Sequence, residues 1–218
     1  MANLAQQLRP KTLDDVIANK KVKPAIRNFL NEKCHYWLFH GPTGTGKTSL
    51  ARIVARELRN GDESELSVMT LNAAEVRGIE DVREIVSASI MGPMTGDHRV
   101  IIIDEAHQLT KPAQHLLLNE FEKVWGDTGP IWVLCTTKFD DVLKPLRDRC
   151  PASFKLEAMG PAERRELVER AAKHLDYTGD TSRFIKRLDA LEVFSARDVL
   201  GAFERFYQGV PIEEAVGV

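Results

Sequence analysis

The stretch that decides the fold reads Gly41-Pro42-Thr43-Gly44-Thr45-Gly46-Lys47-Thr48. It matches the phosphate-binding loop pattern, in which two glycines separated by four residues precede lysine and threonine. The glycines let the backbone curl so that successive N–H groups face an anion, and a helix beginning near Lys47 adds the positive end of its dipole. The alternative is a glycine-rich turn with a chance Lys-Thr pair. The β-rich run before the loop and the helical pattern after it favour the phosphate cradle.

Short β-rich runs alternate with helical patterns on both sides of this loop. Parallel strands that are buried on both faces read as continuous apolar stretches. Five runs are expected to be strands, namely His35–His40, Ser67–Leu71, Val100–Asp104, Ile131–Thr136 and Ser153–Leu156. We therefore predict an α/β fold, a P-loop NTPase with a five-stranded parallel sheet.

The strand signals end near residue 159. Three helical segments follow, at about residues 162–175, 181–191 and 196–207. The change predicts a P-loop ATPase domain over residues 1–159 and a small three-helix lid domain over residues 160–218.

Composition excludes several classes of protein. Lys+Arg total 30 and Asp+Glu total 32, so there is no global basic field of the kind that marks many nucleic-acid binders. The longest apolar runs are far shorter than the ~20 residues of a membrane span, and no apolar leader opens the chain. The three cysteines lack metal-ligand spacing, so neither zinc nor a disulfide is expected. We expect a soluble, cytoplasmic protein that does not enter a membrane.

The third β-rich run ends in two carboxylates, Asp104 and Glu105. Asp104, together with the Thr48 hydroxyl, is expected to hold Mg²⁺, and Lys47 to neutralise the β- and γ-phosphates of ATP. Glu105 is expected to orient and deprotonate the attacking water. A solvated turn after a core strand is the alternative, and the upstream P-loop favours the functional interpretation. His107 is expected to cap or pack against the next helix.

Three further blocks resemble the small subunits of replication factor C and the motor subunit of the bacterial clamp loader, which are AAA+ ATPases. The blocks are Leu71–Arg83, Asp104–Thr110 and Lys144–Cys150, and they follow the order and spacing of those proteins. Leu8–Val16 is similar to the N-terminal segment that packs beside adenine in this family. The resemblance covers about residues 8 to 207 and implies an AAA+ motor of the clamp-loader type.

The resemblance also implies roles for individual residues. In the family, an arginine after a serine is the arginine finger that reaches the ATP of the neighbouring subunit; here Asp148 replaces the serine and Arg149 is retained. The alternative for Arg149 is structural, as a cap of the helix before the last strand. Arg197 aligns with the second sensing arginine, in the lid. The first sensor, a polar residue after the fourth strand, is either Thr137 or Lys138.

Contacts with DNA are implied in the same way, because clamp loaders hold the phosphates of primer-template DNA. Arg77 and Lys111 lie in the expected regions, and Arg83 is a weaker candidate. One departure concerns the helix after Glu105, where the family commonly has a basic residue near Asn119. Here Glu120 stands beside that asparagine.

The implied partners are a sliding clamp, primer-template DNA and other AAA+ subunits, most naturally in a pentamer. The sequence ends just past the lid, without the collar domain of clamp loaders, so it is expected to be either a truncated chain or a collarless relative. It has no zinc-binding insertion after the P-loop helix, which places it nearer replication factor C and viral loaders. A nucleoid-associated or viral replication setting fits this resemblance.

Two other functions remain open from the sequence. One is another AAA+ DNA motor, for branch migration or helicase loading, which would share the ATP chemistry and differ in its partner. The other is a nucleotide-sensing scaffold with negligible turnover.

Overall fold

The computed structural model describes residues 3–59, 68–90, 98–125, 129–191 and 195–217. The chain divides into two compact units. The sheet unit comprises residues 21–41 and 47–156. The helical unit comprises residues 1–20, 42–46 and 157–218. The N-terminal residues thus group with the C-terminal helices, an arrangement that a linear division at residue 159 does not express.

The sheet unit contains the predicted sheet, and the predicted fold class is confirmed. Its strands are β1 (Tyr36–His40), β2 (Val68–Asn72), β3 (Val100–Asp104), β4 (Ile131–Thr136) and β5 (Ala152–Lys155). All five are parallel, in the order β2-β3-β4-β1-β5. The expected strand bounds hold to within one residue for the positions that the structure describes.

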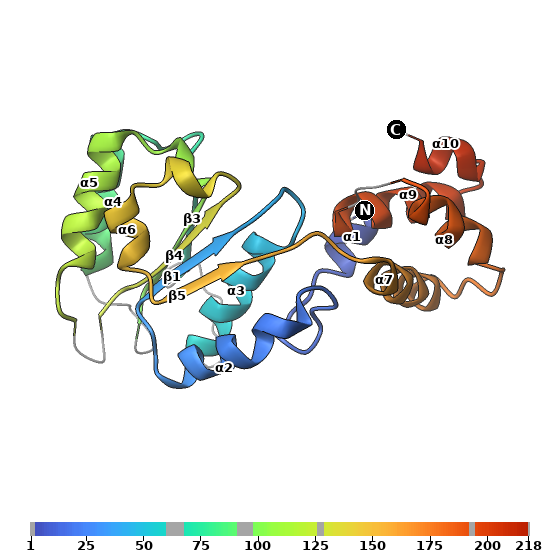
Figure 1. Ribbon diagram of the computed structural model, residues 1–218, viewed down its shortest axis with the longest axis horizontal. Coiled ribbons are helices and arrows are strands. Elements are labelled where there is room, and N and C mark those ends of the chain that lie inside the picture. Colours follow the sequence, from blue (N-terminus) through green and yellow to red (C-terminus); the bar gives the residue numbers. More distant parts are fainter. Residues whose placement is uncertain (1–2, 60–67, 91–97, 126–128, 192–194, 218) are drawn as a thin grey trace. The chain divides into compact units, whose positions relative to one another are not determined.

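Helices cover both faces of this sheet, as Figure 1 shows. One side carries α2 (Lys23–Asn31) and α3 (Lys47–Leu58), and the other carries α4 (Ile79–Ile90), α5 (Lys111–Phe121) and α6 (Lys144–Asp148). Three short 3₁₀ turns are η1 (Lys20–Val22), η2 (Ala106–Gln108) and η3 (Phe139–Asp141). Every residue of β4 is buried, because this strand lies between β3 and β1 with helices above and below.

The strand order determines where a ligand can bind. In an open parallel sheet, loops at the carboxyl ends of the strands form the binding edge. β1 ends at His40 and pairs with β4 so that His40 lies opposite Thr136, while β3 ends at Asp104. The start of the P-loop, the acidic pair and the expected sensor therefore meet at one edge.

The helical unit contains α1 (Leu4–Gln7), α7 (Pro161–His174), α8 (Ser182–Asp189), α9 (Ala196–Tyr207) and α10 (Ile212–Val216). The three predicted helices are present. A further short helix, α10, follows these three, and its five residues are too few to show helical periodicity in the sequence. Its Ala215 and Val216 are buried in the core of this unit, which also includes Leu4, Phe184 and Phe203. No helix in the described part of the chain is both long and apolar enough to cross a membrane.

Candidate functional site

The P-loop follows β1 and has the backbone conformation that glycine permits. Gly41, Gly44 and Gly46 have φ angles of +141°, +76° and +93°. A Cβ atom on Gly41 would lie 2.2 Å from the carbonyl oxygen of Leu156, whereas one on Gly46 would meet nothing within 4 Å. Glycine is thus required at position 41 by both conformation and close backbone approach, and at position 46 by conformation alone.

This difference gives a stability prediction with its own control. Gly41→Ala is expected to lower the free energy of unfolding by about 2 kcal/mol more than Gly46→Ala, because overpacking against a rigid backbone adds to the strain of positive φ. Urea unfolding of the two variants beside the wild type measures the difference. Equal losses would mean that the contact with Leu156 relaxes freely.

Lys47 is the first residue of α3, and its side chain is largely withdrawn from solvent. The residue is 6 % exposed, and its Nζ donates a hydrogen bond to the carbonyl oxygen of Gly41 at 2.9 Å. Burial lowers the pKa of the Lys47 ammonium, and the nearby carboxylates of Glu105 and Asp104 act in the opposite direction. A buried cation at a helix N-terminus is well suited to bind phosphate.

Thr48 and Asp104 come together although they are far apart in the sequence. Thr48 Oγ1 donates to Asp104 Oδ2 at 2.7 Å, and the amide of Glu105 donates to Asp104 Oδ1 at 3.0 Å. No group of three or more His, Cys, Asp or Glu residues that could hold a metal occurs among the described positions. A hydroxyl beside one carboxylate fits Mg²⁺, which takes few protein ligands and fills its shell with water and phosphate oxygens.

Glu105 is held on both its backbone and its side chain. It has φ 53° and ψ 41°, a left-handed conformation that is strained for a residue with a Cβ atom. Its Oε2 accepts a hydrogen bond from Thr137 Oγ1 at 3.1 Å. Lys138, the other candidate for the first sensor, is 65 % exposed at its side chain and faces Asp141. Of the two alternatives, the structure brings Thr137 to Glu105.

Sequence reasoning missed the surroundings of His107. The expectation was a cap or a packing residue of the next helix, but the imidazole lies 3.3 Å from Glu105 Oε2 and 3.1 Å from Thr136 Oγ1, measured from Nδ1. The signal that could have revealed this is the spacing Asp-Glu-x-His, since the tight turn η2 folds the histidine back toward the strand end.

Arg149 lies at the C-cap of α6, within the sheet unit. Its Nη1 donates to the carbonyl oxygen of Pro145 at 3.2 Å, and its Nη2 pairs with Glu122 Oε1 at 2.6 Å. Neither partner belongs to the phosphate site. The side chain is 37 % exposed, so it is accessible from outside the subunit.

Arg197 lies in the helical unit, near the N-terminus of α9, and is exposed. Ser195 caps this helix by accepting a hydrogen bond from the amide of Asp198. The same unit includes the P-loop residues 42–46, and a Cβ on Gly44 would lie only 1.8 Å from Ser195 Cβ. The turn of the P-loop therefore packs against the start of α9, two residues before Arg197.

The candidate DNA-binding residues are partly brought together. Arg77 and Lys111 are both exposed, and the amide of Thr110, the residue before Lys111, donates to the carbonyl oxygen of Arg77 at 3.1 Å. Arg83 pairs with Glu80 on α4. Glu120 is 5 % exposed and paired with Lys123, so its charge is not presented on the surface beside Asn119.

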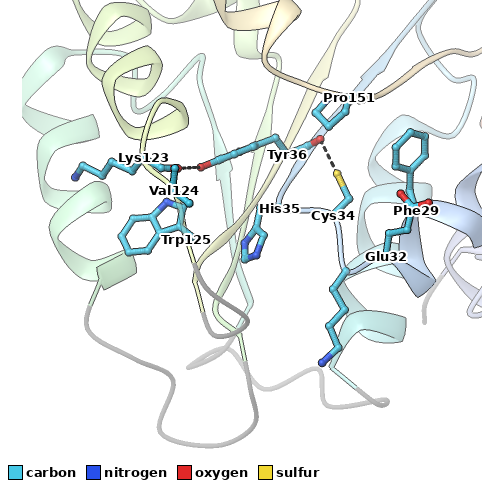
Figure 2. Close-up of a pocket in the computed structure, with 10 residues that line it drawn as sticks. Phe29, Glu32, Cys34, His35, Tyr36, Lys123, Val124, Trp125 and Pro151 are labelled. Atoms are coloured by element: carbon cyan, nitrogen blue, oxygen red, sulfur yellow. Dashed lines mark hydrogen bonds between the residues drawn. The ribbon is translucent and has the colours of Figure 1, made fainter.

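A separate cavity of about 370 Å³ lies at the opposite, N-terminal end of β1 (Figure 2). Tyr36 crosses it, with its hydroxyl donating to the carbonyl oxygen of Lys123 at 3.3 Å, and Cys34 Sγ contacts the carbonyl oxygen of Tyr36. Because it lies away from the carboxyl ends of the strands, this cavity is not part of the phosphate site.

Comparison with known proteins identifies an ATPase family over the residues that carry the P-loop and the acidic pair. The family described as "ATPase family associated with various cellular activities (AAA)" matches residues 37–158. The chain is similar to the replication factor C small subunit of Natronomonas pharaonis, with 32 % identity over 72 % of this chain and 48 % of the relative. It is also similar to that of Methanothermobacter thermautotrophicus, with 30 % identity over 86 % of this chain and 56 % of the relative. The chain thus spans about half the length of these relatives.

Solved structures of the same fold include RuvB variants of Thermotoga maritima. One has a TM-score of 0.74 at 23 % identity and is matched over 96 % of this chain and 71 % of its own. The RuvB Holliday junction branch migration motor of the same organism has a TM-score of 0.67 at 24 % identity, with 94 % and 74 % covered. At this identity the likeness shows a shared fold and nothing about the substrate.

Proposed function

The chain belongs to the AAA family of ATPases, and on that premise we propose that it is the motor part of a clamp loader, which uses ATP to place a sliding clamp on primed DNA. The observation that carries the ATPase chemistry is the contact between Thr48 Oγ1 and Asp104 Oδ2, since it sets two Mg²⁺ ligands beside the phosphate cradle. The similarity to replication factor C small subunits supports the clamp-loader assignment.

Each residue of the site has a distinct task in this proposal. Thr48 and Asp104 would hold Mg²⁺, which when bound would supply charge neutralisation on the phosphates of ATP. Lys47 binds the β- and γ-phosphates, for which its buried ammonium is suited. Glu105 takes a proton from the attacking water, while its Oε2 is held by Thr137. Thr137, which follows β4 where the first sensor is expected, thereby contacts the proposed base, Glu105.

Two arginines complete the proposed site. Arg149 reaches the ATP of a neighbouring subunit, because its own partners, Pro145 and Glu122, lie outside the phosphate site and its side chain is exposed. Arg197 senses nucleotide from the lid, in keeping with the approach of the P-loop to Ser195. A ring or spiral of subunits, such as a pentamer, follows from a finger that acts in trans.

DNA contacts are proposed for Arg77 and Lys111, which are both exposed and whose chain segments are joined by the hydrogen bond from the Thr110 amide to the Arg77 carbonyl oxygen. Arg83 is proposed as a weaker contributor, since its charge is already paired with Glu80. These side chains would hold phosphates, so they add affinity without sequence preference.

The proposal predicts that ATP turnover rises with primed DNA and rises further when the cognate sliding clamp is added. Steady-state ATPase assays with neither, either or both measure this. Stimulation by DNA alone would indicate another DNA motor, such as a branch migration motor, and ATP binding without turnover would indicate a sensing scaffold.

Arg77→Ala with Lys111→Ala should remove the DNA effect and lower the slope of log affinity against log salt by about 2. Arg52→Ala, an exposed change on α3, serves as the control.

A further inference from the structure

The imidazole of His107 is buried beside the proposed catalytic base. Its side chain is 6 % exposed, and Nδ1 lies within reach of two oxygens, Glu105 Oε2 at 3.3 Å and Thr136 Oγ1 at 3.1 Å. The backbone of Glu105 is strained, because a residue with a Cβ atom rarely adopts its φ of 53°. A strained residue keeps one orientation only where its neighbours fix it.

The hydrogen-bond partners assign the proton on the ring. Nε2 of Gln108, which can only donate, lies 3.3 Å from Nε2 of His107, so the ring nitrogen there accepts. In the neutral imidazole the proton is then on Nδ1. Thr136 Oγ1 already donates its proton to the carbonyl oxygen of Lys138 at 3.0 Å. Nδ1–H is therefore the donor in the hydrogen bond to Thr136 Oγ1, and the carboxylate oxygen Oε2 of Glu105 lies 3.3 Å from the same nitrogen.

We propose that His107 is a positioning residue for hydrolysis, whose Nδ1–H holds the carboxylate of Glu105 in the orientation that takes a proton from the attacking water. This inference rests on the proposed ATPase function. Nδ1 of His107 lies 3.3 Å from Oε2, the oxygen to which Thr137 donates, so the imidazole and the hydroxyl face the same side of the carboxylate from different elements. The other oxygen, Oε1, then accepts the proton. Loss of one donor lets the side chain rotate, and a small misplacement of a reacting group can reduce the rate by about 100-fold.

Three substitutions separate this role from simple packing. His107→Leu fills the space without a donor and is expected to lower kcat about 10- to 100-fold, with the Kd of ATP changed less than about 2-fold. His107→Asn places an amide N–H where Nδ1 lies and should restore kcat to within about 5-fold of the wild type. His107→Gln places its amide near Nε2 instead and should resemble His107→Leu. Single-turnover rates and nucleotide titrations on the full chain, with thermal unfolding of each variant, supply the measurements.

A double variant tests whether His107 acts through Glu105. In the Glu105→Gln background, His107→Leu should cause no further loss of turnover, because the base is already absent. The inference is overturned if His107→Leu keeps kcat within about 2-fold, if His107→Asn is no better than His107→Leu, or if the two losses simply add. If Glu105→Gln itself leaves turnover unchanged, it is the proposed ATPase mechanism that fails, and that outcome is distinct from a failure of the His107 assignment.

Discussion

Lys47→Ala is expected to abolish ATP binding, whereas Glu105→Gln is expected to leave binding intact and to stop hydrolysis. Lys47 is a buried cation at the P-loop, so its removal leaves the phosphates without their main counter-charge. Glu105→Gln keeps the shape of the side chain and its contact with Thr137 but removes the group that accepts a proton. The two variants should therefore lose activity for different reasons.

Ligand-dependent unfolding separates these reasons in one experiment. ATP at about 100 times its Kd should stabilise the wild type and Glu105→Gln by about 2.7 kcal/mol, and should not stabilise Lys47→Ala. Turnover is measured on the same samples, and Glu57→Gln, an exposed change on α3, is the control. Equal loss of ATP binding in both variants would show that the two roles are wrongly divided.

Arg149→Ala is expected to bind ATP nearly as the wild type does and to lose turnover by at least ~100-fold, a barrier increase of roughly 2.7 kcal/mol. The reason is that, in the proposed assembly, a guanidinium from the next subunit would stabilise charge that develops only in the transition state. Lys144→Ala, at the start of the same helix, removes an exposed positive charge and should have little effect. Nucleotide titration and turnover at saturating ATP and protein concentration measure both quantities.

Mixing two inactive variants tests the geometry of the finger. Arg149→Ala subunits keep the cradle and Lys47→Ala subunits keep the finger, so mixed assemblies contain some composite sites with both. Part of the activity should return on mixing. A mixture that assembles but stays as inactive as its components would place Arg149 in a structural role, as the cap of α6 held by Glu122.

The fold was predictable because its signals are local and strong. The apolar run that ends at Asp104 reads as a buried strand from composition alone, and the P-loop pattern sets strand and helix on either side. The short helix α10 was missed because its stability comes from burial of Ala215 and Val216, not from a repeating pattern. Likewise, the sequence could not assign residues 1–20 to the helical unit, since that grouping depends on long-range packing by residues such as Leu4.

The proximity of Thr48 to Asp104 was predictable for a different reason, since the P-loop and the strand-end carboxylates form contiguous motifs at neighbouring strand ends. The contacts of His107 with Glu105 and of Arg149 with Glu122 join residues across turns or separate helices. The geometry of these two contacts depends on how η2 folds and on how α5 packs against α6. Neither can be predicted from a single stretch of sequence.

The left-handed backbone at Glu105 also affects which residues can replace glutamate at this position. A residue with a Cβ atom in that conformation costs about 1–2 kcal/mol, and asparagine tolerates it better than glutamate. Glu105→Asn is therefore expected to remove the proposed catalytic base while lowering the backbone strain at this position. Low backbone strain and the proposed turnover therefore favour different residues at this position. In the proposed assembly, subunits with this change would bind nucleotide without hydrolysing it and would still fold.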